Sequence, residues 1–158
     1  MLDRAQIVEV LSDLVRIESV NPELARGGSG ELKIASYVAD FLSAAGLKAR
    51  IQKVGRRRAN AVGVLRGRGG GRSLMLNGHL DTVGVVGMED PFGARVEGDR
   101  LYGRGAEDMK GGIAAALVAA AAGASCGRIL LCHSIASRSP DAPARLRRRK
   151  TPTKSQAT

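Results

Sequence analysis

The chain has 158 residues and no Trp, a size that fits one domain whose core would be built from Val, Leu, Ile and Ala. Its net charge of +10 is unevenly spread: residues 128–158 carry 8 Lys or Arg against 1 acidic residue, and residues 1–127 carry 17 against 14. Two cysteines without companions, Cys126 and Cys132, exclude a disulfide framework. Because no stretch resembles a secretory signal or a membrane span, we expect a cytoplasmic protein without a membrane partner.

Two amphipathic helices are predicted in the first third of the chain. Apolar residues recur at helical spacing from Ile7 to Val15, which predicts a helix over residues 3–18 that begins at Asp3. Asn21-Pro22 then predicts a turn. A second helix is expected over residues 29–45, with Gly46 as its terminator. Its predicted buried side consists of Leu32, Ala35, Tyr37, Val38, Phe41 and Leu42.

Three short strands are predicted after the second helix. Alternating or apolar runs place them at residues 47–54, 60–66 and 73–76. The glycine-rich segment Gly67–Gly71 is interpreted as a hairpin connection between the last two strands. This interpretation makes those two strands hydrogen-bonded neighbours in one sheet.

The following elements complete an alternation of strands and helices. A small strand pair is expected at residues 94–97 and 100–102, turning at Gly98-Asp99. An alanine-rich helix over residues 112–122 comes next, and a buried strand over residues 127–132 follows it. The alternation predicts an α/β architecture.

The last part of the chain has a different composition. Residues 133–158 are rich in Arg, Ser, Pro and Ala, offer no apolar face and are expected to be a disordered basic tail. Such basicity would suit nucleic acid or another anion, but no aromatic residue lies in the tail and no recognised nucleic-acid module precedes it. Binding to nucleic acid is therefore disfavoured. The predicted organisation is residues 1–132 as one domain and residues 133–158 as a tail.

Two glycine-flanked segments hold the residue types that bind a hydrolytic metal. His79 and Asp81 are two positions apart, so on an extended segment both side chains point to one face, at the carboxyl end of the strand predicted at residues 73–76. There an imidazole would bind a metal and the nearby carboxylate would orient the imidazole. A histidine that only satisfies a hydrogen bond in a loop is the competing interpretation of His79.

Asp108 lies between Gly105 and Gly111-Gly112, whose small size lets the backbone approach a bound ion. Its carboxylate has two oxygens and would be able to bridge two metal ions about 3.5–4 Å apart. Mixed nitrogen and oxygen ligands of this kind suit zinc, with cobalt or manganese as substitutes. Lys110 is interpreted as a solvated lysine or one that pairs with a carboxylate.

Together, these segments closely resemble the metal-binding signatures of a metallopeptidase family. That family includes acetylornithine deacetylase, succinyl-diaminopimelate desuccinylase, aminoacylase and glutamate carboxypeptidase. The resemblance is collinear over roughly residues 3–131. It is carried by Gly78-His79-Leu80-Asp81-Thr82-Val83, Asp90-Pro91-Phe92, Leu101-Tyr102-Gly103-Arg104-Gly105-Ala106 and Asp108-Met109-Lys110-Gly111-Gly112, with Leu14 to Pro22 similar to the family's opening segment.

The resemblance implies a three-layer α/β/α zinc-peptidase-like catalytic domain with two zinc ions. By this resemblance His79 is a ligand of one metal, Asp108 is the carboxylate that bridges the two ions, and Asp81 is a catalytic residue that tunes His79. The implied activity is metal-dependent hydrolysis of amide bonds in N-acyl amino acids or small peptides.

The sequence departs from the family where a Glu-Glu pair, a general base and a metal ligand, is expected. The chain reads Cys132-His133-Ser134 there, and no Glu follows Glu107. The later acidic ligand, the distal histidine and the homodimer interface domain also have no counterpart, and neither His133 nor Asp141 is a good replacement ligand. We therefore expect a truncated catalytic domain that binds metal weakly and does not turn over. Loss of the missing half would also leave a sheet edge and the helix face Ile113–Val118 exposed.

Two alternatives follow from this departure. The chain would be a non-catalytic remnant that binds metal, or one that binds nucleic acid or another anion through its tail. The compositional change also matches what a frameshift in a GC-rich gene would produce. That hypothesis is wrong if neither other reading frame downstream of codon 131 continues into a Glu-Glu pair and a distal histidine.

Overall fold

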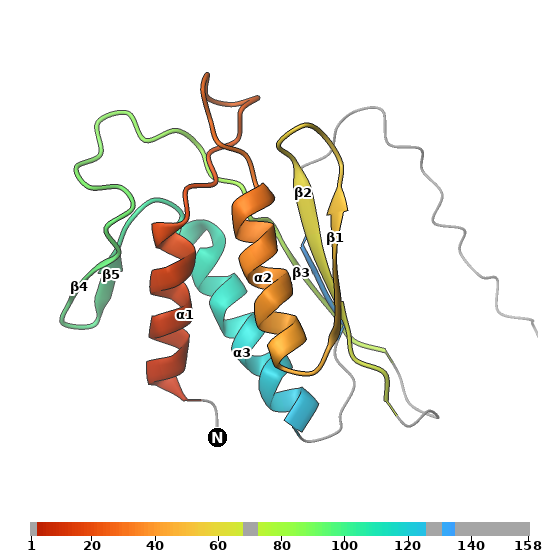
Figure 1. The fold of residues 1–158 in the computed structure, drawn as a ribbon. Coiled ribbons are helices and arrows are strands. Elements are labelled where there is room, and N and C mark those ends of the chain that lie inside the picture. Colours follow the sequence, from red (N-terminus) through yellow and green to blue (C-terminus); the bar gives the residue numbers. More distant parts are fainter. Residues whose placement is uncertain (1–2, 68–72, 126–130, 135–158) are drawn as a thin grey trace, which may run out of the picture.

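The computed structural model describes residues 3–67, 73–125 and 131–134, and only the backbone of Ser125 and residues 131–134. Helices and strands alternate along this part of the chain, and the predicted α/β architecture is confirmed (Figure 1). The helices are α1 (Arg4–Arg16), α2 (Leu32–Ala44) and α3 (Gly111–Ser125), with the short π turn η1 (Ala106–Lys110) before α3. The strands are β1 (Lys48–Lys53), β2 (Ala59–Val64), β3 (Met75–Gly78), β4 (Arg95–Glu97), β5 (Arg100–Tyr102) and β6 (Leu131–Ser134).

Four of these strands form one sheet in the order β1-β2-β6-β3. β1 and β2 are antiparallel, as are β2 and β6, whereas β6 and β3 are parallel. Because β6 lies between β2 and β3, the prediction of a hairpin at Gly67–Gly71 is wrong. Local glycine content does not reveal that a strand distant in sequence inserts between two consecutive ones. The predicted small pair is present as β4 and β5, with Glu97 opposite Arg100.

The described helices lie on one side of this sheet, as Figure 1 shows, so the described residues supply the sheet and one helical layer of the expected three. Within that layer α2 packs on β1 and β2, α3 packs on β6 and β3, and α1 packs on α3. No helix among the described residues is long and apolar enough to cross a membrane. The predicted tail lies outside the described residues from position 135 onward, while β6 runs to Ser134.

Local sequence signals explain the boundaries of the first two helices. Asp3 is the N-cap of α1 and accepts a hydrogen bond from the backbone N–H of Ala5 at 2.9 Å. α2 begins at Leu32, three residues later than predicted, and ends before Gly46, whose φ of +86° is the left-handed conformation of a helix terminator. The predicted buried side of α2 is partly wrong because Leu32 is 36% exposed and Ile34, which was left out, is fully buried.

The core lies between the helices and the sheet and, as composition predicts, is built from aliphatic residues. The face of α3 that was expected to be exposed, Ile113–Val118, contributes Ile113, Ala114, Leu117 and Val118 to this core, so that expectation is wrong. This face of α3 is covered by α1 and α2. Among the described strands, β3 is an edge strand of this sheet, and its Met75 is 57% exposed. The core consists of Val10, Leu14, Ile34, Ala35, Val38, Ala39, Leu42, Leu47, Ala59, Ala61, Leu80, Ile113, Ala114, Leu117, Val118 and Ala120.

Candidate metal centre

Two segments from different parts of the chain meet at the carboxyl end of β3. The first, residues 78–82, is called here the His79 arm, and the second, residues 105–110, the Asp108 arm. His79 follows Gly78, the last residue of β3, and a Cβ at Gly78 would lie 2.5 Å from Ile113 Cδ1. Glycine at this position therefore lets β3 pack closely on α3. The strand ends two residues later than predicted, but it does deliver His79 at its carboxyl end.

The two arms are joined through the His79 imidazole. Its Nδ1 lies 3.0 Å from the Asp81 backbone oxygen and 3.2 Å from Asp81 Oδ1. Its Nε2 lies 3.1 Å from Asp108 Oδ1. The structure thus brings together all three residues that the sequence singled out, with Asp81 behind the ring and Asp108 in front of it.

The Asp108 arm is a tight turn between β5 and α3. Gly105 begins it with φ +79°, and Asp108 has extended backbone angles (φ −114°, ψ 97°) inside the turn. The Asp108–Met109 peptide bond is cis. The Asp108 side chain is 87% exposed, whereas that of Asp81 is 8% exposed. The carboxylate of Asp108 is therefore open to an incoming ligand, and that of Asp81 is not.

Lys110 does not match its predicted role. It is 1% exposed, and its Nζ donates a hydrogen bond to the Ile17 backbone oxygen at 2.9 Å. Burial lowers the pKa of Lys110 to about 8, against an opposing effect of Glu18. This hydrogen bond anchors the Asp108 arm to Ile17, the C-cap of α1. The aliphatic chain of Lys110 lies beside Gly105, the first residue of the same arm. A lysine next to an exposed aspartate in sequence gives no signal of this burial.

Asp81 is held from behind by residues that sequence reasoning did not assign to the site. Asn21 Nδ2 donates to Asp81 Oδ2 at 2.7 Å, and Arg58 Nη2 lies 4.0 Å from the same oxygen. Arg58 also pairs with Glu31 and Glu23. Asn21 had been predicted as part of a turn, within a segment similar to the family's opening segment, and had no predicted role in the site. Arg58 belongs to the run Arg56-Arg57-Arg58, which resembles a solvated loop.

The electrostatics of the site favour positive charge on the imidazole. Burial lowers the pKa of His79, but the Asp81 backbone oxygen and the carboxylates of Asp108 and Asp81 outweigh it, so the pKa lies above its ordinary value. Burial also raises the pKa of Glu31, which Arg58 partly offsets. A cation at His79 Nε2 would be stabilised by the same carboxylates.

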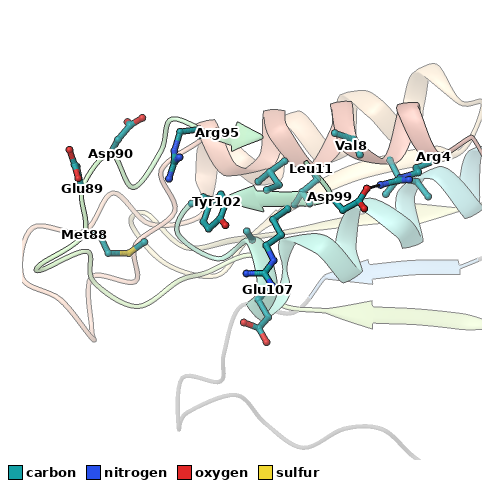
Figure 2. Close-up of a pocket in the computed structure, with 15 residues that line it drawn as sticks. Arg4, Val8, Leu11, Met88, Glu89, Asp90, Arg95, Asp99, Tyr102 and Glu107 are labelled. Atoms are coloured by element: carbon teal, nitrogen blue, oxygen red, sulfur yellow. Dashed lines mark hydrogen bonds and ion pairs between the residues drawn. The ribbon is translucent and has the colours of Figure 1, made fainter. Parts of the chain in front are cut away.

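A cavity of about 270 Å³ opens in front of His79 and Asp108. Leu24 and Val83 give it an apolar wall, and Arg104 and Glu107 are charged residues on its lining. A second, larger cavity of about 1140 Å³ adjoins it, since Glu107 lines both. Figure 2 shows this larger cavity between α1 and the β4–β5 hairpin, with Arg4 paired to Asp99 and Arg95 beside Tyr102.

The donor set fits part of a metal site. His79 Nε2 and Asp108 Oδ1 face one another at the cavity, and one nitrogen with one oxygen is the mixed ligand chemistry that zinc accepts. Within the described residues, however, no three His, Cys, Asp or Glu side chains form a complete metal-binding group. Asp81 faces the other ring nitrogen.

Of the two residues named above as possible replacement ligands, His133 and Asp141, the structure describes only the backbone of His133. His133 lies in β6, where its backbone is opposite Asn77 of β3, and Ser134 is opposite Gly78. The parallel strands therefore end at the same edge of the sheet, beside His79. The His133 side chain and Asp141 lie outside the described residues.

Comparison with known proteins agrees with this geometry. Residues 75–131, which contain both arms, match the model of peptidase family M20/M25/M40. The chain is 43% identical over 118 residues to a succinyl-diaminopimelate desuccinylase of Dinoroseobacter shibae, an alignment that covers 72% of this chain and 29% of that protein. It is 32% identical over 116 residues to a probable succinyl-diaminopimelate desuccinylase of Staphylococcus aureus, covering 71% and 26%. The chain spans less than a third of the length of these curated relatives.

Solved structures with a similar fold include human carnosine dipeptidase 1, with a TM-score of 0.67 and 22% identity over 82% of this chain and 31% of that one. A tripeptidase from Staphylococcus aureus has a TM-score of 0.61 and 17% identity, covering 85% and 36%. These likenesses confirm that the described α/β fold is that of a portion of such proteins. The matched segment, the collinear relatives and this fold all make the chain similar to a portion of the proteins of peptidase family M20/M25/M40.

Proposed function

We propose that this chain carries the first half of the active site of a metal-dependent amide hydrolase. His79 and Asp108 would be its metal ligands, and Asp81 would support His79. The observation that carries this proposal is the contact of His79 Nε2 with Asp108 Oδ1 at 3.1 Å across 29 positions of sequence. Residues 1–132 would form the N-terminal part of the catalytic domain.

The residues present fit zinc, for which cobalt or manganese would substitute. When bound, zinc would polarise an amide carbonyl and lower the pKa of a water molecule. The protein's own part is to hold the ligands: Asp81 keeps His79 Nδ1 occupied, which leaves Nε2 directed at Asp108. Lys110 holds the turn that presents Asp108 by its hydrogen bond to Ile17.

Amide hydrolysis also requires a group that takes a proton from the attacking water. Glu107 is the last glutamate of the sequence, so no Glu-Glu pair follows β6. We infer that residues 1–158 bind metal without hydrolysing substrate. The class of substrate for the complete site would be an N-acyl amino acid or a small peptide, a proposal supported by the relatives named desuccinylases.

Zinc titration by calorimetry, followed by assays with N-succinyl and N-acetyl amino acids and a tripeptide, tests this proposal. We expect zinc binding that Asp108→Asn abolishes and that Asp40→Asn leaves unchanged, because Asp40 is an exposed aspartate on α2. We expect no hydrolysis above the rate of a zinc blank. Hydrolysis by the chain would contradict the incomplete site, and zinc binding that survives Asp108→Asn would contradict the ligand assignment.

A further inference from the structure

We infer that Asn21 and Arg58 are positioning residues for His79, which act through the Asp81 carboxylate. Together they fix Asp81 so that the imidazole keeps Nδ1 toward Asp81 and Nε2 toward the cavity. The inference rests on the proposed function only in taking Nε2 as the metal-binding atom. It assigns a role to a buried polar cluster defined here as Asn21, Glu31, Arg58 and Asp81.

Asn21 supplies a directional contact to this cluster. The residue is 1% exposed, and its Nδ2 donates to Asp81 Oδ2 at 2.7 Å. Its Oδ1 accepts a hydrogen bond from the backbone N–H of Glu23 at 2.9 Å, and its own N–H donates to the Thr82 oxygen at 2.8 Å. The turn at Asn21 is therefore docked on the His79 arm by backbone and side chain together. Because Asn21 engages Oδ2, the other oxygen of Asp81 faces His79 Nδ1 at 3.2 Å.

Arg58 supplies the charge that balances this buried carboxylate. Its Nε lies 2.8 Å from Glu31 Oε2, and its Nη1 lies 2.8 Å from Glu23 Oε1. These two carboxylates fix the plane of the guanidinium, whose Nη2 is directed at Asp81 Oδ2 at 4.0 Å. Glu31 is fully buried and Arg58 is 8% exposed, so the cluster is held away from water. Removing either charge from a buried ion pair leaves the other without a counter-charge, which is strongly destabilising.

This arrangement determines which imidazole nitrogen carries the proton. Asp81 presents a backbone oxygen and a carboxylate oxygen to Nδ1, and both atoms accept hydrogen bonds. At Nε2 the facing acceptor is one oxygen of the 87% exposed Asp108 carboxylate, at 3.1 Å. The two acceptors of buried Asp81 therefore favour the Nδ1–H form of neutral His79, which leaves the Nε2 lone pair for a metal. If Asp81 rotates, the preference for Nδ1–H is weakened.

Two conservative variants test the inference. Asn21→Asp keeps the oxygen that accepts from Glu23 and replaces the donor to Asp81 with an acceptor. Arg58→Lys keeps the charge but has no planar fork to engage Glu31, Glu23 and Asp81 together. Arg56→Met is the matched control, since Arg56 is an exposed arginine of the same turn. His133→Gln is introduced in every chain, so that His79 is the single histidine observed.

The first readout is the ¹⁵N chemical shifts of the metal-free His79 ring at about pH 9, well above the usual imidazole pKa. We expect the Nδ1–H form in the parent and in Arg56→Met, and a mixture of both tautomers in Asn21→Asp and Arg58→Lys. The second readout is zinc affinity, which we expect to fall about 10- to 100-fold in both positioning variants. Near-ultraviolet circular dichroism identifies the folded variants, and either one that folds decides the question.

A folded positioning variant that keeps the Nδ1–H form and a zinc affinity within about twofold of the parent would overturn the inference. A parent that shows the Nδ1–H form but binds no zinc, with variants that lose that form, would support the inference and refute the proposed function. The two failures are therefore distinguishable.

Discussion

The two arms of the candidate site are held by different kinds of interaction. The His79 arm has buried polar side chains behind it, and its Asp81 is 8% exposed. The Asp108 arm has a backbone fixed by glycine and by Lys110, but its carboxylate is 87% exposed. From this difference we infer that His79 is oriented before any ligand binds, whereas the turn exposes Asp108 to solvent. Changes in the first arm should affect stability and binding together, and changes at Asp108 should affect binding alone.

The largest effect is expected from breaking the cluster behind the His79 arm. Arg58→Met would leave the buried carboxylates of Glu31 and Asp81 without their guanidinium partner, and should lower the free energy of unfolding by about 3–5 kcal/mol. Urea denaturation measures this loss. Arg56→Met should change it by less than about 0.5 kcal/mol. Equal effects of the two substitutions would show that the cluster does not stabilise the fold.

A smaller effect is expected where the Asp108 arm touches the His79 arm. A Cβ at Gly105 would meet Thr82 Cγ2 at 2.6 Å, at a residue whose φ is +79°. Gly105→Ala should therefore destabilise the chain by about 2–3 kcal/mol, combining backbone strain with a steric clash. Gly98→Ala is the control for strain alone, because Gly98 has φ +57° with open space around it, and it should cost about 1 kcal/mol. Thermal denaturation of both variants separates the two causes.

Outside both arms, Tyr37 on α2 should make the stability of the fold depend on pH. Burial, together with Asp13, raises the pKa of Tyr37 to about 12, and its hydroxyl donates to Asp13 Oδ2 at 3.1 Å. Between the ordinary tyrosine pKa of about 10 and this value, the folded chain binds more protons than the unfolded chain, so stability must fall as pH rises. Tyr37→Phe should remove that part of the fall. The unfolding midpoints of parent and variant, compared at several pH values between about 10 and 12, measure this contribution. A difference between the two midpoints that does not change with pH would contradict the burial of the hydroxyl.

The smallest effect on stability is expected at Asp108 itself. Because the carboxylate is almost fully exposed, Asp108→Asn should change the free energy of unfolding by less than about 0.5 kcal/mol while it abolishes zinc binding. Urea denaturation of the metal-free chain checks the first part. A substantial loss of stability would mean that Asp108 holds the fold and not a ligand.

The same contrast explains which features were predictable from sequence. His79, Asp81 and Asp108 lie in short segments with glycine neighbours. Their types and spacing suggested a metal site, and the resemblance of both segments to a metallopeptidase family singled it out. Helix α1 and its N-cap Asp3 were equally predictable because their signals are local. The position of β6 between β2 and β3 was not, since strand order depends on pairing between distant segments. Arg58 was missed for a related reason: a run of three arginines does not reveal which one turns inward toward Glu31.

The central claim is that His79, and not the chain's other histidine, is a metal ligand. The visible absorption spectrum of the chain titrated with cobalt tests it most directly, because the bands report the ligands and geometry of the bound ion. His79→Gln should abolish the bands of bound cobalt, and His133→Gln should leave them in place. Bands that survive His79→Gln and vanish with His133→Gln would contradict the account.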